Sequence, residues 1–414
     1  MSLVRADAIA IPLADESVDL IVTSPPYFAL RSYTDGGEHY DGQIGSELTP
    51  QDFLEALWAV TAECVRVLKP SGSIWVNLGD KYAGSGGHNN SGISEKSTLS
   101  GNGHKGGVGK AGPTKIKATR RSAPDSYSKA SIGGARPKSL LGLPWRYAIG
   151  CIDQLDLILR AEVVWSKPNG LPESVTDRVR RSHEQWFHLT KNGRYFAAVD
   201  EVREPHTGGT NPSGPARRAA GWSSGEGERH RFVGSDVADF NPLGKLPGSV
   251  WSIPSEPLKV PDWLDVDHFA AFPQEWPRRI ILGWSPSAYC TKCDEPRRPV
   301  TTIERTPFSG DPRDQRKRTS VGGGERQWQD ASREITGYAC ACDVPLAPTR
   351  PAVVLDPFSG TGTVAGVARA LGRYGIGMDL SADYLRLAKW RIFESGHFAK
   401  SRARTDRENQ GVLL

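Results

Sequence analysis

The stretch that decides the fold is Ala352-Val353-Val354-Leu355-Asp356-Pro357-Phe358-Ser359-Gly360-Thr361-Gly362-Thr363. It begins with an apolar run typical of a buried strand, and residues 364–371 continue as a helical pattern. A strand, a glycine-rich turn and a helix bring backbone N–H groups close to a ligand. No Gly-Lys-Ser/Thr follows, so the turn is not a P-loop, and its Gly-x-Gly falls short of the full dinucleotide fingerprint.

A second predicted strand, Gly375-Ile376-Gly377-Met378-Asp379, follows this helix and ends in a carboxylate. An acidic side chain about 20 residues beyond the glycine turn is placed to bind ribose hydroxyls. A glycine-rich turn followed by a chance acid would give the same letters, so these two segments do not define a site by themselves.

Near the other end of the chain, Ser24-Pro25-Pro26-Tyr27 follows the apolar run Val18–Thr23, which predicts another buried strand. The prolines lack an N–H and cannot continue a ladder, so they form a stiff turn with outward carbonyls. A hydroxyl before the turn and a ring after it suit a flat ring that carries an amino group. A nucleobase flipped out of a duplex is such a ring. A strand-ending turn with a packed tyrosine would have the same sequence.

Strands and helices alternate along the chain, which predicts an α/β fold with a doubly wound, mostly parallel sheet and helices on both faces. Ligands bind such a sheet at the carboxyl ends of its strands, where the strand order reverses. Both turns follow carboxyl ends, so we expect them side by side. The predicted helices are 51–68, 143–158 and 273–283, and the predicted strands include 73–78, 157–165 and a hairpin of 183–189 with 194–197.

Taken together, the two ends resemble the S-adenosylmethionine-dependent DNA amino-methyltransferases of the permuted (β-type) order. In that family the Ser/Asp-Pro-Pro-Tyr block comes first and Asp-Pro-Phe-x-Gly-x-Gly-Thr comes last, as here. The resemblance covers about half of the chain and implies a circularly permuted Rossmann-like fold that methylates a flipped base in double-stranded DNA. Matching blocks between the two ends are Arg5–Ala8, Ser73–Asn77, Val163–Asn169 and His268–Pro273.

For the target base, the chemistry requires acceptors for both amine hydrogens, because the amine lone pair is delocalised into the ring. We assign these to Ser24 Oγ and the Pro25 carbonyl, while Pro26 stiffens the turn and Tyr27 stacks on the base. Most of the acceleration would come from holding the amine in line with the methyl carbon. No His/Asp pair has a spacing that would make Ser24 a nucleophile.

For the methyl donor, we expect Phe358, Gly360 and Gly362 to shape the pocket around the methionine part. Asp356 would bind its amino group and Asp379 the ribose hydroxyls. The resemblance makes Asp7 a contact to the adenine, although a solvated loop acid would look the same. The whole predicted donor site comprises Asp7, Asp356, Pro357, Phe358, Ser359, Gly360, Thr361, Gly362, Thr363 and Asp379, with the two threonines near the carboxylate.

The serine before Pro-Pro-Tyr bears on the choice of base. In this family Ser is typical of cytosine-N4 enzymes and Asp or Asn is common in adenine-N6 enzymes, so we expect cytosine N4, with adenine N6 as the alternative. An enzyme acting on RNA or on a protein amide would normally carry the blocks in the opposite order. A DNA-binding module with an inactive methyltransferase fold is a further alternative, which the intact blocks disfavour.

The distribution of charged residues along the chain supports a nucleic-acid partner better than the net charge of the whole chain does. The 414 residues carry 52 basic and 47 acidic side chains, a net charge of +5. Residues 85–140 hold ten Lys/Arg and two acids within a Gly/Ser-rich segment with few large apolar groups. Such a segment predicts a mobile basic arm on DNA phosphates, or else a solvated insertion. No 18-residue apolar stretch or signal segment is present, so we expect a cytoplasmic protein without membrane contact.

The cysteines divide into two groups. Cys64 and Cys151 lie in apolar helical stretches and are expected to be core residues. Cys290-x2-Cys293 and Cys340-x-Cys342, 46 residues apart, suit a tetrahedral zinc ion in a cytoplasmic protein, although free or redox thiols are the alternative. The residues between the pairs, 301–339, predict a polar loop whose base the metal clips.

These patterns divide the chain into seven segments. Residues 1–84, 141–200, 250–289 and 344–414 would form the methyltransferase domain, of which the first is the catalytic part and the last the donor-binding part. Residues 85–140 would be the basic insertion, 201–249 the target-recognition region and 290–343 the four-cysteine zinc element. A cognate restriction endonuclease is a partner that this organisation allows. The recognition sequence and the oligomeric state are not encoded in any pattern that we identify.

Overall fold

A computed structural model describes residues 1–29, 34–35, 38–39, 42–83, 135–170, 172–205, 243–264, 266, 272–307, 328–342, 344 and 347–398. Most of the predicted basic insertion and most of the predicted target-recognition region lie outside these residues, as does the greater part of the block His268–Pro273. No helix in the described ranges is long and apolar enough to cross a membrane.

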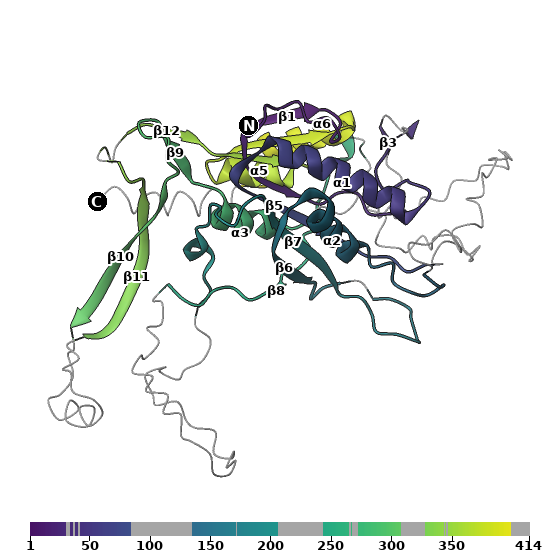
Figure 1. The fold of residues 1–414 in the computed structure, drawn as a ribbon, viewed down its shortest axis with the longest axis horizontal. Helices are drawn as coiled ribbons and strands as arrows, with labels where there is room; N and C mark the ends of the chain where they lie inside the picture. Colours follow the sequence, from purple (N-terminus) through teal and green to yellow (C-terminus); the bar gives the residue numbers. More distant parts are fainter. Residues whose placement is uncertain are drawn as a thin grey trace, which may run out of the picture.

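One eight-stranded sheet organises the protein (Figure 1). Seven of its strands run in the same direction, and β7 is antiparallel to both of its neighbours, so the expected mostly parallel sheet is confirmed. In spatial order the strands are β1 (Ser2–Arg5), β14 (Tyr374–Asp379), β13 (Val353–Asp356), β2 (Val18–Thr23), β5 (Leu68–Leu78), β7 (His183–Thr190), β6 (Ile158–Ser166) and β8 (Val250–Ser252).

The strand order reverses between β13 and β2. From β2 the chain moves to β5 on one side, whereas from β13 it moves to β14 on the other. The two central strands pair directly, with Val354 beside Leu20 and Leu355 beside Ile21. This pair joins the two ends of the chain in one sheet and creates the switch point at which α/β proteins bind ligands.

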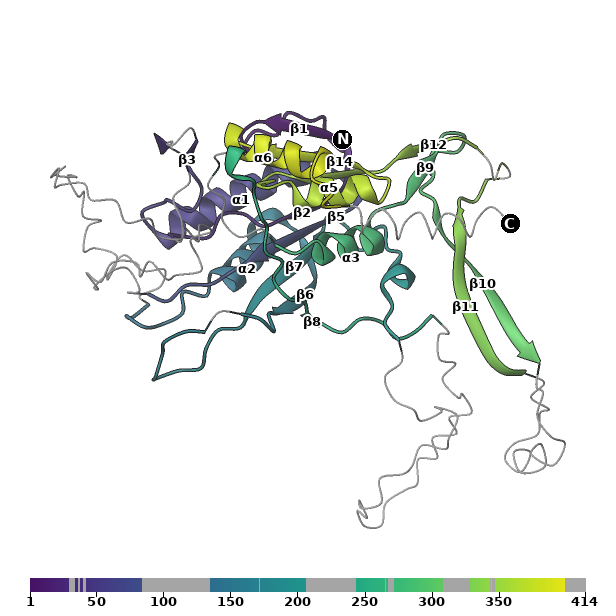
Figure 2. The same ribbon diagram turned by 180° about the vertical axis from the view of Figure 1, so that it is seen from behind.

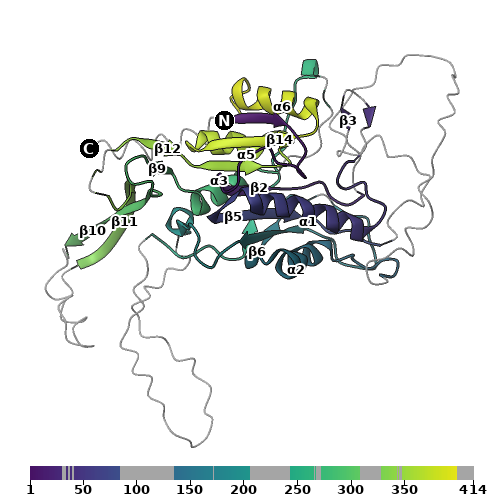
Figure 3. The same ribbon diagram turned by 45° about the horizontal axis from the view of Figure 1, so that its top comes forward.

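Helices cover both faces of the sheet (Figures 2 and 3). Because strand side chains alternate between faces, Ile21 packs with α1 (Pro50–Val67) and α2 (Leu143–Leu155). Its neighbours Leu20 and Val22 pack with α3 (Glu275–Trp284) and α5 (Thr363–Ala370) on the other face. Thr49 caps α1 by accepting a hydrogen bond from the Asp52 amide. The described residues also form α6 (Ala382–Phe393) and the 3-10 turns η3 (Val199–Val202) and η4 (Asp262–Leu264).

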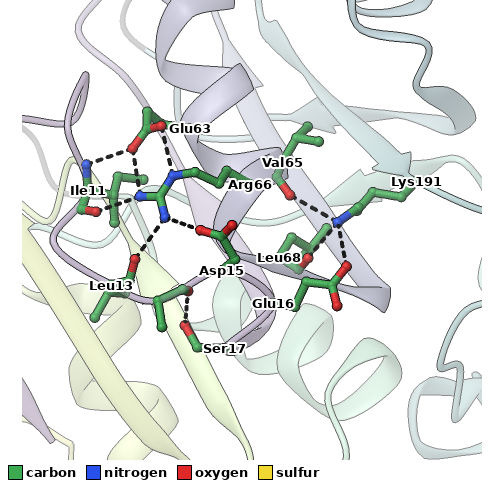
Figure 4. A network of polar contacts seen from close by, with 11 residues as sticks. Ile11, Leu13, Asp15, Glu16, Ser17, Glu63, Val65, Arg66, Leu68 and Lys191 are labelled. Atoms are coloured by element: carbon green, nitrogen blue, oxygen red, sulfur yellow. Dashed lines mark hydrogen bonds and ion pairs between the residues drawn. The ribbon is translucent and has the colours of Figure 1, made fainter.

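Arg66 on α1 fixes the segment that connects β1 to β2 (Figure 4). Its guanidinium donates to the carbonyl oxygens of Ile11 and Leu13 over 2.7 and 2.9 Å. It also pairs with Asp15 and Glu63 at 2.6 and 2.8 Å. Since the planar guanidinium offers five donors, one side chain holds the whole connection against the helix.

Residues 301–339, between the two cysteine pairs, were predicted as a polar loop. This prediction is wrong for 301–307 and 328–339, whereas 308–327 lie outside the described residues. Residues Arg298–Pro307 (β10) and Trp328–Ala339 (β11) form an antiparallel ribbon that projects from the body of the protein (Figure 1). β-Branched residues such as Val300, Thr301 and Thr302 favour strand pairing over a loop despite the surrounding charges. At its base, β9 (Ala288–Cys290) pairs with β12 (Thr349–Pro351). A further short pair is β3 (Thr34–Asp35) with β4 (Glu38–His39).

The predicted hairpin of residues 183–189 with 194–197 is also wrong in its second half. β7 pairs instead with β6 and β5, and residues 194–197 are not a strand. Phe196 is buried, and its amide donates to the Ser71 carbonyl in a contact outside any ladder. The apolar letters in this segment therefore reflect packing onto the core rather than strand pairing.

Candidate active site

Two turns meet at the switch point. Thr23 is the last residue of β2 and Asp356 the last of β13, and the Thr23 hydroxyl donates to Asp356 Oδ1 over 2.7 Å in the buried interior. Pro25 from one turn and Phe358 from the other line the same small cavity. The structure therefore brings together the two turns that the sequence predicted to form one site.

The side chains of the Ser24-Pro25-Pro26-Tyr27 turn are tied to the neighbouring strand. The Ser24 hydroxyl donates to Asn77 Oδ1 over 3.2 Å, and the Tyr27 phenol lies 2.7 Å from the same oxygen. Asn77 in turn donates to the Gln185 carbonyl on β7. Because Ser24 uses its proton on Asn77, its oxygen lone pairs stay available to accept hydrogen bonds from a ligand amine.

Glu184 and Lys167 extend this network of contacts around Tyr27, and the sequence analysis assigned neither a role. Glu184 Oε2 lies 2.7 Å from the Tyr27 phenol, and its other oxygen pairs with the Lys167 ammonium. Lys167 also lies over the ring of Trp165, 4.1 Å from its centroid. The sequence provided one indication for Lys167, because this residue belongs to Val163–Asn169, a block that resembles the family. It provided none for Glu184, which lies on the separate strand β7.

The position of the Tyr27 ring depends on a glycine. A Cβ atom on Gly79, just after β5, would lie 2.6 Å from Cε2 of Tyr27, closer than real contacts allow. Only a residue without a side chain lets the tyrosine ring pack against the backbone at this place. The tyrosine is partly buried, so part of it remains accessible.

The glycine-rich turn between β13 and α5 is held by Asp379. Its carboxylate accepts from the Gly360 amide over 2.8 Å and from the Ser381 amide over 2.9 Å. Gly360 and Gly362 adopt φ values of 47° and 75°, the left-handed region that favours glycine. The Asp379 carboxylate therefore lies at the glycine-rich turn, where the sequence predicts that it binds ribose hydroxyls.

Asp356 is fully buried at the start of this turn. Its Oδ1 accepts from Thr23 and from the Phe358 amide, whereas Oδ2 is buried with no hydrogen-bond partner in the described part of the chain. Burial raises the pKa of Asp356 to about 7. A buried carboxylate oxygen without a partner is costly, and a cationic amino group at this place would satisfy it. This geometry fits the predicted role of Asp356.

Arg391 supports the same turn from α6, and no sequence pattern indicated this role. The buried guanidinium donates to Thr361 Oγ1 and Thr363 Oγ1, both at 2.7 Å, and to the Thr361 carbonyl. Burial lowers the pKa of Arg391 to about 10. The two threonine hydroxyls that the sequence placed near the donor carboxylate therefore already have a partner within the protein.

The remaining predicted contacts are Asp7, which is exposed, and Pro357 and Ser359, which are buried. Asp7 follows β1 and is exposed, and its Oδ1 accepts from the Ile9 amide over 3.0 Å. The Ala6 amide donates to the Asp379 carbonyl, so the Asp7 turn lies next to the end of β14. Pro357 and Ser359 belong to the glycine-rich turn, where the Ser359 amide donates to the Met378 carbonyl.

The cysteines separate as expected. Cys64 and Cys151 are buried in the core, and all four remaining sulfur atoms lie within 4.8 Å of one another. This cluster is at the amino end of β13, because β12 leads directly into that strand, whereas Asp356 marks its carboxyl end. The thiols are therefore remote from the two turns.

The fold and the two apposed turns define an amino-methyltransferase in which the Ser24–Tyr27 turn precedes the glycine-rich turn along the chain. The chain belongs to the N6/N4 DNA methylase family, whose pattern matches residues 18–288 and 349–390. It is a DNA methyltransferase.

Known relatives resemble this chain over most of its length. The Type II methyltransferase M.Cfr9I of Citrobacter freundii is 28% identical over 394 residues, which are 94% of this chain and 87% of that protein. M.XycI of Xanthomonas campestris pv. cyanopsidis is 35% identical over 243 residues, 58% of this chain and 69% of that protein. Among solved structures, the PvuII DNA methyltransferase (cytosine-N4-specific) aligns over 99% of this chain and 92% of its own, with 14% identity and a TM-score of 0.49.

Proposed function

We propose that the protein transfers a methyl group from S-adenosylmethionine to the exocyclic amine of a base flipped out of double-stranded DNA, with cytosine N4 as the target. The observation that carries this proposal is the buried bond from Thr23 to Asp356. It joins the base-binding turn to the donor-binding turn at the switch point of the sheet, so a donor in one turn would face a base in the other.

On the donor side, S-adenosylmethionine would supply an electrophilic methyl group on a sulfonium. The methyl carbon–sulfur bond would break as the carbon–nitrogen bond forms, the donor would leave as a neutral thioether, and the methylated nitrogen would lose one proton to water. Asp356 Oδ2 would accept from the donor's amino group, which would satisfy the buried oxygen. The amides of the turn and the carboxylate of Asp379 would hold the ribose and the methionine part, with Phe358 against the pocket wall and Asp7 near the adenine. Pro357, Ser359, Gly360 and Gly362 would shape the turn, and Arg391 would hold Thr361 and Thr363 in place.

On the base side, Ser24 Oγ and the Pro25 carbonyl would accept the two amine hydrogens. This withdraws the nitrogen lone pair from the ring and makes the amine a better nucleophile. Pro26 would hold the turn rigid, and Tyr27 would stack on the base while Asn77 and Glu184 fix its hydroxyl. A single neutral acceptor at Ser24 suits a pyrimidine, which favours cytosine N4 over the alternative, adenine N6.

The DNA contacts proposed for residues 85–140 and 201–249 rest on sequence. The first segment would neutralise phosphates, and the second would read base edges in a groove. The relatives named as Type II methyltransferases make a cognate restriction endonuclease a candidate partner, and methylation of genomic DNA would place the reaction in the cytoplasm. None of these steps requires Cys290, Cys293, Cys340 or Cys342, so a zinc ion there would be structural.

The test is a transfer assay with tritiated S-adenosylmethionine and duplex DNA, followed by mass spectrometry of the digested nucleosides. We expect 4-methylcytosine from the wild type and none from Ser24→Ala or Asp356→Asn. Finding 6-methyladenine without 4-methylcytosine would overturn the choice of base. Label in neither nucleoside, from protein that binds both donor and DNA, would support an inactive DNA-binding module instead.

A further inference from the structure

The four clustered thiols have the dimensions of a tetrahedral metal site. Their sulfur atoms all lie within 4.8 Å of one another, with 3.8 Å between Cys290 and Cys342 and 3.4 Å between Cys340 and Cys342. A zinc ion bound to four sulfurs at about 2.3 Å gives sulfur–sulfur edges of about 3.8 Å. A disulfide requires about 2.05 Å, and all six cysteines are free.

The backbone presents these sulfurs as two converging pairs. Cys290 ends β9, and a tight turn brings Cys293 back, with Asp294 at a φ of 57° and its amide donating to the Cys290 carbonyl. Cys340 and Cys342 follow β11 directly, so they arrive from the ribbon.

We propose that these four cysteines bind one zinc ion, which fastens the β10–β11 ribbon to the β9–β12 pair. The ligand set is complete with four thiolates and contains no open position, so the ion would be structural rather than catalytic. Four thiolates of this kind select zinc over hard cations such as magnesium, which prefer oxygen ligands. This site is separate from the proposed methyl transfer and does not depend on it.

The contacts around the cluster carry its effect to the centre of the sheet. Tyr289, next to Cys290, donates to the carboxylate of Asp19 on β2. Asp19 is buried, and its Oδ2 accepts from the Val353 amide at the start of β13 over 2.7 Å, while Lys69 pairs with Oδ1 at 2.6 Å. The ion would therefore hold the β9–β12 pair, which anchors the amino ends of the two central strands.

The first test is the metal content of the wild-type full chain purified without chelators, measured by inductively coupled plasma mass spectrometry. We expect one zinc per chain, and cobalt exchanged into the site should show thiolate charge-transfer bands and the visible bands of a tetrahedral ion. Zinc at background level, or cysteines isolated as disulfides, would overturn the proposal. Neither measurement depends on a variant that folds.

Variants then assign the ligands. Cys293→Ser and Cys342→Ser, one from each pair, should lose the bound zinc, whereas Cys151→Ala should keep one ion because this buried cysteine lies outside the cluster. Full zinc in both serine variants would place the ion elsewhere and refute the site. The Cys151 variant controls for the loss of a thiol as such.

Hydrogen exchange tests the structural role on wild-type protein before and after zinc removal by a chelator. We expect faster exchange in β9 and β12 and unchanged exchange in β5, whose amides pair within the sheet. Unchanged exchange in β9 and β12 would refute the fastening role. None of these experiments measures methyl transfer. A failed transfer assay would therefore not change the conclusion about zinc.

Discussion

The hydroxyl of Thr23 donates to Asp356 Oδ1 over 2.7 Å, although 333 positions separate the two residues in the chain. The bond is buried and joins the carboxyl ends of adjacent strands. One turn follows each residue, and the proposed roles of these turns are to hold the base and the donor. A change at either residue should therefore disturb both binding sites, although the chain segments are remote in sequence.

Thr23→Val should weaken donor binding while the protein stays folded. The substitution keeps the shape of the side chain but removes a buried donor, which costs about 1–3 kcal/mol and leaves Asp356 Oδ1 with only the Phe358 amide. Isothermal titration calorimetry with the donor would measure the loss, and Thr23→Ser, which keeps the hydroxyl, should behave nearly as the wild type. Equal affinity in the valine and serine variants would contradict a role for the bond.

Donor affinity should depend on pH through Asp356. Its pKa is raised to about 7 by burial, so a proton must leave before the carboxylate can bind a cationic amino group. We expect affinity to rise with pH up to about 7 and to fall again above about 8, where the donor's own amino group deprotonates. Asp356→Asn should lose the rising limb and bind weakly throughout. A rising limb of the same midpoint in this variant would assign the proton to another group.

Gly79→Ala should weaken base binding much more than it weakens donor binding. The new Cβ would lie 2.6 Å from the Tyr27 ring and displace it from its position beside Asn77 and Glu184. Gly193→Ala is a matched control, because its Cβ would meet nothing within 4 Å. The fluorescence of 2-aminopurine at the target position would report base extrusion, and a separate titration would report donor affinity. Normal extrusion by the Gly79 variant would show that the ring position is not needed.

The sequence predicted both turns and the central strands because each is a local pattern. Proline cannot continue a ladder after Thr23, and a Gly-x-Gly turn after a buried strand has few alternatives. Motif order then indicated which turns should meet, and the structure agrees. The sequence did not predict the ribbon of β10 and β11, because its many charged residues are typical of a loop. Charged residues do not prevent strand pairing, which the β-branched residues of this segment favour.

Side chains that contact the turns from other elements could not be predicted in this way. Glu184 reaches Tyr27 from β7, and Arg391 reaches Thr361 from α6, so each contact depends on tertiary packing. A buried arginine in an amphipathic helix has the same local sequence as an exposed one. The error at residues 194–197 has the related cause that apolar residues can be buried without forming a strand.

Glu184→Gln should lower the turnover rate more than it changes donor affinity. Glu184 bridges the Tyr27 phenol and the Lys167 ammonium, so loss of its charge would release the lysine and weaken the hold on the ring. Tyr27→Phe loses the hydroxyl but keeps the stacking surface. Its activation free energy should rise to a similar degree, by about 0.5–1.5 kcal/mol. Tyr27→Ala should lose about 1–3 kcal/mol more, the value of one stacked base. Steady-state kinetics with duplex DNA would separate these cases, and a Phe variant as poor as Ala would assign the effect to the hydroxyl alone.

Arg391→Lys should weaken donor binding although Arg391 is buried beneath the turn and is not assigned a donor contact. An ammonium cannot reproduce the planar donors that reach Thr361 and Thr363, and each hydrogen bond to a charged group contributes about 1.5–3 kcal/mol. If about 1.4 kcal/mol of this loss appears in the binding free energy of the donor, the donor affinity should fall roughly tenfold. Thr363→Val removes one acceptor, so it should add little when combined with Arg391→Lys, because both changes break the same contact.

The readouts for Arg391 separate positioning of the turn from general stability. Donor titrations would be made at a temperature where each variant is fully folded, as judged from its unfolding curve. A lower melting temperature with unchanged donor affinity would limit Arg391 to a structural role. Additive losses of donor affinity in the Arg391 and Thr363 double variant would show that the two residues act separately. Coupled losses would show that the buried guanidinium holds the turn in the geometry that the donor requires.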